Sequence, residues 1–432
     1  MKIVIAVIIF SVLILIHELG HFLLARKNGI RVIEFSLGFG PRILSFGKGE
    51  TKYSWKLFPF GGSCIMQGED EEVAEGEDQE KSFSSKSVWA RLSVILAGPV
   101  FNFLLALFLA VVVTGFTGYD SPEVLSVEEN TPAYEAGLQS GDIITEYNNN
   151  TIFFGRELMV EEYINPLGTA PVEITYKRDG EKNTVTIVPE EYIWYAVGMQ
   201  YYVEEGRTAS VDVITTGGPL EAAGVKVGDV ITSINGENIS DSQELFDYFE
   251  ENPLSSEDVN ITLLRDGETY SVSVEPMKNT KQILGFTYNT VREKTTALGV
   301  IKYSFLEMEY EIEVVVKSLG MLFTGKVSAN DISGPVGIVD IIGQTYDTTK
   351  TEGFFTTSMS MAMLIIMLSA NLGVLNLIPF PALDGGRIVF LIIEAVRGKP
   401  ISKSKEGIVH FIGMILLMIL MVLVLMNDIR KL

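Results

Sequence analysis

Four long apolar stretches constrain the fold of this 432-residue chain more than any other feature. They cover residues 3–24, 88–114, 359–380 and 408–426. A helix of about 20 apolar residues crosses the hydrocarbon core of a bilayer, so each stretch is long enough to span it once. Because 47% of all residues are also hydrophobic, the chain is predicted to be a polytopic α-helical membrane protein with four transmembrane helices.

The first stretch has a second interpretation as a secretory signal, whose apolar core is about 7 to 15 residues long. This stretch is longer, lacks the small residues of a cleavage site, and contains His17, Glu18 and His21. These features favour a membrane span.

Lysine and arginine residues beside the spans predict the orientation, since they concentrate in cytoplasmic loops. They cluster after the first span, before the second, and between the third and the fourth. Residues 26–87 and 385–407 are therefore expected in the cytoplasm. Both termini and the segment 118–358 are expected outside, although Arg430 and Lys431 mildly oppose this orientation.

The net charge of −22 excludes nucleic acid as a partner, because binding a phosphate backbone requires a basic surface. Part of the acidic excess forms a dense run over residues 69–80, which is predicted to be a solvated, mobile loop. Cys64 is the only cysteine, so no intramolecular disulfide stabilises the outer segment.

An internal repeat with a period of 87 residues occupies the outer segment. The sequence Gly-Asp at 141–142 recurs at 228–229, and Arg-Asp-Gly-Glu at 178–181 recurs at 265–268. Short alternating stretches around the Asp-Gly pairs predict β-hairpins. Two homologous domains are therefore expected, at 121–203 and 208–290.

Both copies contain Pro-x-x-x-Ala-Gly followed by Gly-Asp-x-Ile, which resembles the PDZ family in the permuted form common in bacterial proteases. Such domains bind a peptide or protein C-terminus between a backbone loop and a strand edge. A size filter or a spacer is the alternative role. The resemblance implies two carboxylate-binding loops, formed by Val197, Gly198 and Met199 and by Leu284, Gly285 and Phe286.

The first span contains His-Glu-Leu-Gly-His at 17–21, which matches the pattern H-E-x-x-H. On a helix this spacing puts both imidazoles on one face, where they can ligate one zinc ion while the glutamate acts on a bound water. Ionisable residues inside a span are costly and normally mark function. A polar cluster that only binds neighbouring helices is the alternative.

A catalytic zinc ion usually has three protein ligands. His410 is the one other histidine, and its isolated position near the start of the fourth span favours a structural role. Asp384 is the preferred third ligand, because it follows the third span near the inner face of the bilayer. His17 lies at a similar depth, about 21 Å along the first span at 1.5 Å per residue.

Taken together, the motifs resemble the bacterial site-2 proteases of the regulator-of-sigma-E type, in peptidase family M50. The resemblance covers nearly the whole chain. Besides H-E-x-x-H it rests on Phe-Ser-Leu-Gly-Phe-Gly at 35–40, Pro-Phe-Gly-Gly at 59–62, Ala-Gly-Pro-x-x-Asn-Phe at 97–103, Ser-Gly-Pro-Val-Gly-Ile at 333–338 and Asn-x-x-Pro-x-Pro-x-x-Asp-Gly at 376–385. Residues 63–66, Ser-Cys-Ile-Met, depart from the Tyr-Val-Lys-Met that is usual in the family.

The resemblance implies that His17, His21 and Asp384 bind one zinc ion and that Glu18 is the general base and acid of a zinc metalloendopeptidase. Such an enzyme hydrolyses peptide bonds within or next to transmembrane segments. It lies in the bacterial cytoplasmic membrane, with its active site towards the cytoplasm.

Substrate recognition is expected next to the metal. The family implies roles for Asn376, Pro379 and Pro381, and the two prolines also predict that the third span ends in irregular backbone. The segment 53–66 is expected to form a membrane-associated β-hairpin, whose edge near Gly61 and Gly62 pairs with an unwound substrate.

The expected substrates are single-span membrane proteins already trimmed by another protease, such as anti-sigma factors or remnant signal peptides. Two alternatives stay open. One is a membrane zincin for quality control, which usually takes its third ligand from a glutamate in a soluble domain. The other is a non-catalytic membrane scaffold that recruits partners through its PDZ domains.

The expected fold is therefore mixed α+β. Apolar residues recur at helical spacing between 301 and 322, which predicts an amphipathic helix in the linker that follows the repeats. Besides the two repeats, the expected parts are a first span at 1–25, a cytoplasmic loop at 26–87, a second span at 88–116, a helical linker at 296–358, a third span at 359–384, a cytoplasmic loop at 385–407 and a fourth span at 408–427.

Overall fold

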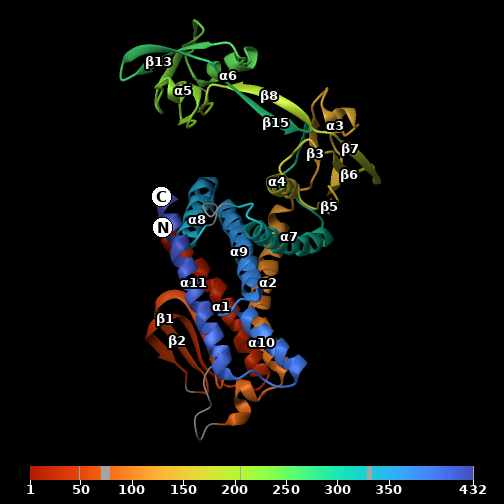
Figure 1. The fold of residues 1–432 in the computed structure, drawn as a ribbon, viewed down its shortest axis with the longest axis vertical. Coiled ribbons are helices and arrows are strands. Elements are labelled where there is room, and N and C mark those ends of the chain that lie inside the picture. Colours follow the sequence, from red (N-terminus) through yellow and green to blue (C-terminus); the bar gives the residue numbers. More distant parts are fainter. Residues whose placement is uncertain (48, 70–77, 205, 328–332, 432) are drawn as a thin grey trace. The chain divides into compact units, whose positions relative to one another are not determined.

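The computed structural model describes residues 1–47, 49–69, 78–204, 206–327 and 333–431 (Figure 1). The chain divides into two compact units. Unit 1 comprises Met1–Ser121 and Thr290–Leu432, and unit 2 comprises Pro122–Asn289. Most of the acidic run predicted to be a mobile loop, residues 70–77, lies outside the described residues.

All four predicted apolar stretches form helices in unit 1. Within the described residues, these four helices are long and apolar enough to cross a membrane. They are α1 (Lys2–Lys27), α2 (Val88–Thr117), α9 (Phe354–Leu377) and α11 (Lys403–Lys431). The prediction of four long apolar helices is confirmed.

Small residues let α2 pack closely against α1 and α9. A Cβ atom at Gly20 of α1 would lie 2.3 Å from the carbonyl oxygen of Ala97 in α2. On the α9 side, Ala106 and Ala110 of α2 are fully buried, and Gly373 packs against the ring of Phe103. Close backbone approach through small residues is a common way for apolar helices to associate.

The third apolar helix ends earlier than predicted. Helix α9 stops at Leu377, and the next helix, α10 (Asp384–Arg397), begins at Asp384. Asp384 therefore starts a second helix instead of closing the span expected at 359–384, and α10 occupies most of the loop expected at 385–407. The irregular backbone lies around Pro379 and Pro381, because proline cannot continue a helix.

A long β-hairpin follows α1, as predicted for the segment between the first two spans. Strand β1 (Val32–Phe46) pairs antiparallel with β2 (Lys52–Met66), with several register shifts along the pair. Strand β2 also packs on α1. Two short 3-10 turns, η1 (Gln79–Lys81) and η2 (Phe83–Ser85), lead into α2.

The predicted linker helix is α7 (Ala297–Phe323), which packs against α2 and α9. Part of its apolar face, including Ile301 and Phe305, is exposed within unit 1. Helix α8 (Pro335–Thr349) and a 3-10 turn, η4 (Lys350–Glu352), then lead into α9.

Unit 2 contains two lobes with the same arrangement, as the repeat predicts. Each lobe has a four-stranded antiparallel sheet, in the order β5-β4-β6-β7 or β12-β11-β13-β14, and an apolar core of its own. The first lobe contains β3 (Val124–Val127), α3 (Pro132–Glu135), β4 (Ile143–Tyr147), β5 (Asn150–Thr151), α4 (Gly155–Ile164), β6 (Val172–Arg178) and β7 (Glu181–Ile187). The second contains β10 (Val213–Ile214), α5 (Pro219–Ala222), β11 (Val230–Ile234), β12 (Glu237–Asn238), α6 (Ser242–Glu251), β13 (Val259–Arg265) and β14 (Glu268–Val274).

In the order of the chain, the second lobe is inserted within the first. Strand β16 (Phe286–Tyr288) pairs with β3 of the first lobe, whereas β9 (Met199–Gln200) pairs with β10 of the second. Two paired strands, β8 (Glu190–Ala196) and β15 (Met277–Ile283), carry the chain out and back. This differs from the contiguous ranges 121–203 and 208–290 expected from the repeat, because each lobe is completed by the strand that the repeat assigned to the other.

Candidate metal centre

The two histidines of H-E-x-x-H lie on one face of α1. Four residues make just over one helical turn, so the side chains of His17 and His21 stack above each other. Their Nε2 atoms are 3.2 Å apart, and both residues are buried, with 8% and 7% of their surface exposed.

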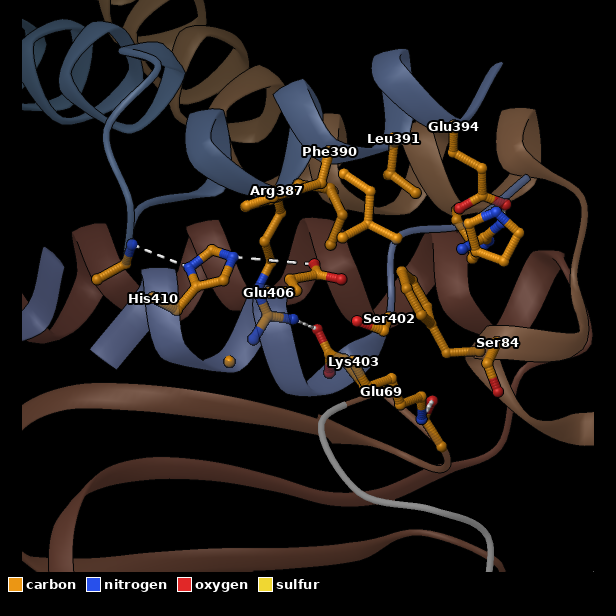
Figure 2. Close-up of a pocket in the computed structure, with 18 of the residues that line it drawn as sticks. Glu69, Ser84, Arg387, Phe390, Leu391, Glu394, Ser402, Lys403, Glu406 and His410 are labelled. Carbon is orange, nitrogen blue, oxygen red and sulfur yellow. Dashed lines mark hydrogen bonds and ion pairs between the residues drawn. The ribbon is translucent and has the colours of Figure 1, made fainter. Parts of the chain in front are cut away.

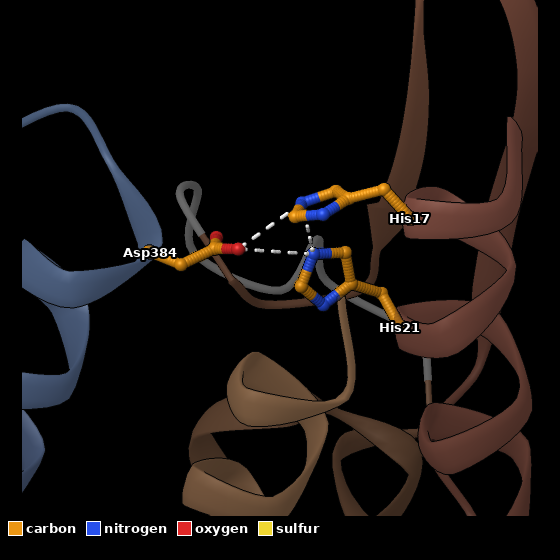
Figure 3. A group of neighbouring side chains, drawn as sticks. All are labelled: His17, His21 and Asp384. Atoms are coloured by element: carbon orange, nitrogen blue, oxygen red, sulfur yellow. Dashed lines mark hydrogen bonds and ion pairs between the residues drawn. The ribbon is translucent and has the colours of Figure 1, made fainter. Parts of the chain in front are cut away.

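Asp384 meets this pair from the first turn of α10 (Figure 3). Its Oδ2 atom lies 3.1 Å from Nε2 of His17 and 3.4 Å from Nε2 of His21. The loop that follows α9 brings the carboxylate to the depth of the histidines, as the comparison of depths predicts. The three residues form a group that could hold a metal ion.

Helix α2 orients both imidazole rings through their other nitrogen atoms. Nδ1 of His21 lies 2.8 Å from the carbonyl oxygen of Val94, so Nδ1 carries the proton and donates it. Nδ1 of His17 lies 3.1 Å from the side-chain amide of Asn102, whose Oδ1 has no hydrogen-bond partner among the described residues. Turning this amide so that Oδ1 accepts from Nδ1 of His17 satisfies both atoms.

This hydrogen bonding leaves three acceptors facing one another. Both Nε2 atoms then present lone pairs, and the buried Oδ2 of Asp384 has no hydrogen-bond donor among the described residues. Such an arrangement fits a cation at its centre. Tetrahedral ligands at about 2.0 to 2.1 Å from zinc lie about 3.3 Å from one another, which matches the observed separations of 3.1, 3.2 and 3.4 Å.

Gly98 of α2 makes room for the two rings. A Cβ atom at this position would lie 2.4 Å from Nε2 of His21 and 2.7 Å from Cε1 of His17. Gly98 and Asn102 were given no role in the sequence analysis beyond membership of a family motif. Their spacing of four residues puts them on one face of a helix, and that signal could have identified them.

Glu18 lies between the metal ligands and the β-hairpin. Its carboxylate lies beside the backbone of Cys64 in β2. A Cβ atom at Gly62 would lie 3.1 Å from Cγ of Glu18, so β2 passes directly over this side chain. The neighbouring Gly61 has a φ of 92°, a conformation that favours glycine.

The other residues singled out in this part of the chain surround the Asp384 loop. Pro379 and Pro381 lie in that loop, while Nδ2 of Asn376 donates to the carbonyl oxygen of Leu372 within α9. Nδ1 of His410 accepts the backbone N–H of Ala382 at 3.0 Å. This structural contact agrees with the role expected for His410.

The two predicted carboxylate-binding loops fall in the lobes opposite to those expected. Val197 is buried in the core of the second lobe, followed there by Gly198 and Met199, and Leu284 is buried in the core of the first lobe. In the first lobe, the side chain of Thr131 covers the loop glycine: a Cβ atom at Gly285 would lie 2.2 Å from it. In the second lobe the residue against Gly198 is Gly218. Phe286 begins the strand that pairs with β3.

Comparison with known proteins identifies the same family that the sequence motifs resemble, and the match covers nearly the whole chain. The sequence profile of Peptidase family M50 matches residues 5–420. A zinc metalloprotease RasP from Geobacillus kaustophilus is 33% identical over 98% of this chain and 97% of its own length. The regulator of sigma-W protease RasP from Bacillus subtilis is 33% identical over 99% of this chain and 97% of its own.

A more distant relative and one solved structure complete the comparison. The regulator of sigma E protease from Haemophilus influenzae is 32% identical over 99% of this chain and 98% of its own. The HtrA3 PDZ domain bound to a phage-derived ligand is 16% identical over 21% of this chain and 93% of its own, with a TM-score of 0.18. That structural likeness is too slight to support a conclusion about the lobes.

Proposed function

The chain belongs to peptidase family M50 and is a zinc metalloprotease, and on that premise we propose that it cleaves membrane proteins within or next to their transmembrane segments. One observation carries this proposal. Two imidazoles and a carboxylate converge between helices that are long and apolar enough to lie in a membrane. Cleavage at this place requires a substrate that enters the lipid-facing bundle.

His17, His21 and Asp384 hold the metal, and Glu18 carries the proton. Bound zinc supplies Lewis acidity, which polarises the scissile carbonyl and makes a bound water more acidic. Glu18 accepts a proton from the attacking water and delivers it to the leaving nitrogen as the C–N bond breaks. Val94 and Asn102 keep the protons of both imidazoles on Nδ1, so that each Nε2 stays directed at the metal.

The substrate helix must unwind before it is cut, because its carbonyl groups are bonded within the helix and exposing them in lipid is costly. Strand β2 runs past Glu18 and presents an edge at Gly61 and Gly62, to which an extended substrate adds as a further strand. On the other side, the irregular backbone around Pro379 and Pro381 and the Asn376 side chain bind the substrate next to Asp384.

In the proposed orientation, both termini and unit 2 lie outside a bacterial cytoplasmic membrane, and the metal centre lies towards the cytoplasm. The positive charges beside the spans support this topology. The exposed apolar residues of α7, including Ile301 and Phe305, then contact lipid.

Two relatives are named as regulators of sigma-W and sigma-E, which supports anti-sigma factors as one substrate class. Remnant signal peptides are a second class, because they are single apolar spans already trimmed by another protease. The two lobes act as PDZ domains that either bind the C-termini exposed by that trimming or exclude untrimmed proteins by size.

A matched pair of measurements tests the proposal. The purified protein is expected to bind one zinc ion per chain and to cleave a single-span reporter in detergent or vesicles. Glu18→Gln removes the proton carrier but none of the three ligands, so it keeps the zinc and loses cleavage by roughly 10²- to 10⁴-fold. Cleavage retained by the Glu18→Gln variant, or a parent protein without zinc, would refute the proposal.

A further inference from the structure

Helix α11 is the least buried of the four long apolar helices. Of the 18 most apolar consecutive residues of α11, 6% are buried, compared with 28% to 44% in the other three helices. The polar contacts of α11 described here lie near its two ends.

Near the C-terminal end of α11, Asp428 caps the N-terminus of α8. Its carboxylate accepts the backbone N–H groups of Gly334, Val336 and Gly337 at 2.9 to 3.1 Å, and the residue is 3% exposed. A carboxylate on the first N–H groups of a helix is a favourable and well-defined contact. This contact fixes where one end of α11 lies.

Near the other end, α11 contacts the loop that carries the metal ligand. His410 lines a cavity of about 660 Å³ and reaches the loop backbone on one side and Glu406 on the other (Figure 2). Nδ1 of His410 accepts the N–H of Ala382 at 3.0 Å. One turn further along, a Cβ atom at Gly413 would lie 2.4 Å from Pro381, so the helix backbone rests directly on the loop.

The contacted loop residue has an unfavourable backbone conformation. Ala382 has a φ of 79°, a region that residues with a Cβ atom rarely adopt. Such a conformation persists only where the surroundings hold it. Asp384 follows two residues later, so a relaxation of Ala382 to negative φ would move the carboxylate away from the two histidines.

We propose that His410 is a positioning residue for the metal site: it holds Ala382 in its left-handed conformation and thereby keeps Asp384 within reach of His17 and His21. The inference rests on the proposed metal centre. Helix α11 then has a supporting function. Asp428 fixes one end of the helix against α8, and His410 near the other end supports the loop that carries Asp384. His410 binds neither the metal nor the substrate.

Zinc affinity of the full-length protein tests this role, measured by competition with a chromophoric chelator. His410→Ala is expected to weaken zinc binding by about 10-fold or more, as is typical when the support of a metal ligand is removed. His410→Asn is expected to restore most of the affinity, since Oδ1 of asparagine lies where Nδ1 of histidine does. The matched control is Phe411→Ala, which shortens an adjacent α11 side chain that is 58% exposed and leaves the contact with Ala382 in place.

A second variant separates positioning from a general loss of stability. Glycine adopts positive φ without strain, so Ala382→Gly combined with His410→Ala is expected to recover zinc affinity that His410→Ala alone loses. The visible spectrum of the cobalt-substituted protein, which reports ligand geometry, is expected to change in His410→Ala and to return in the double variant.

The outcomes distinguish this inference from the proposed function. A parent protein that binds no zinc overturns the metal centre itself. A parent that binds zinc, together with a His410→Ala variant of the same affinity and cobalt spectrum as Phe411→Ala, overturns the positioning role alone. If neither His410→Asn nor the Ala382→Gly, His410→Ala double variant restored zinc affinity, His410 would act only on the stability of the helical unit, and the positioning role would be wrong.

Discussion

Asp229 in unit 2 and Asp384 in unit 1 are both largely buried carboxylates, but they face opposite kinds of partner. Asp229 accepts two hydrogen bonds from Arg265, one from the N–H of Lys226 and one from the hydroxyl of Tyr270, at 2.6 to 2.7 Å. Asp384 faces two imidazole nitrogens whose protons are directed elsewhere.

The repeat supplies the control for this comparison. Asp142 occupies the position of Asp229 in the first lobe and makes the same bidentate pair with Arg178. A buried carboxylate that is fully satisfied by donors and present in both copies is part of the fold. Among the described residues, no hydrogen-bond donor satisfies Oδ2 of Asp384, as is expected of an atom that binds a metal ion.

The largest effect is expected from Asp384→Asn, because an amide is a poor zinc ligand and its N–H₂ group faces two lone pairs. Zinc content is expected to fall to background and reporter cleavage to fall by roughly 10³-fold or more, equivalent to about 4 kcal/mol. Asp142→Asn is the control in unit 2. If that variant lost zinc to the same extent, the distinction between the two kinds of carboxylate would be wrong.

Gly98→Ala tests whether the space around the imidazoles matters as much as their number. The new methyl group displaces His21, so zinc affinity is expected to fall by about 10- to 100-fold, as measured by chelator competition. Gly115→Ala is the control in the same helix, where the nearest atom to an added Cβ is 3.9 Å away. Equal affinities in the two variants would contradict the close packing described for α2.

Acid is expected to weaken the second lobe by a smaller amount. Arg265 holds the pKa of the Asp229 carboxyl at about 2, below its usual value of 3.8. A lowered pKa stabilises the fold above the unfolded-state value, and this contribution, about 2 kcal/mol, is lost as the pH falls from about 4 to about 2.

Pepsin cleavage within residues 197–276 measures this loss. At pH 4 the Asp229→Asn variant is expected to be cut about 30-fold faster than the parent, provided that cleavage follows the population of the opened lobe. The two rates should converge near pH 2. A ratio that does not depend on pH would show that the charge on Asp229 contributes nothing.

The smallest effect is expected from Tyr270, which donates a hydrogen bond to Asp229 and has no tyrosine counterpart in the first lobe. Tyr270→Phe removes one hydrogen bond to Asp229 and is expected to cost the second lobe about 1 kcal/mol. Asn183 occupies the equivalent position of the first lobe, and Asn183→Ala is expected to cost less than about 0.5 kcal/mol there. Hydrogen exchange of the full-length protein, read separately for each lobe, provides both values.

Apolar length and helical spacing predicted much of unit 1 from the sequence. The four helices and the pairing of His17 with His21 follow from local patterns, and the depth of Asp384 follows from the length of the third apolar stretch. Gly98 and Asn102 were missed, because their contacts with the histidines exist only once α2 packs against α1. The end of α9 before Asp384 was also missed, although the effect of the prolines was foreseen.

The exchange of strands between the lobes could not be predicted from the repeat. Val197 and Leu284 are 87 residues apart, so the period is the same whichever lobe each one completes. The choice depends on the pairing of β8 with β15, which is a contact between strands distant in sequence. The sequence predicts such long-range strand pairings less well than it predicts the alternation of residues within a single strand.

The insertion of the second lobe within the first also determines the order in which the two lobes can finish folding during synthesis. Strand β16, which completes the first lobe, is translated only after all the strands and helices of the second lobe. At about 5 to 20 residues per second, the roughly 100 residues between β7 and β16 impose a delay of roughly 5 to 20 seconds. The later-encoded lobe therefore closes first, and the earlier one waits with an open edge beside β3.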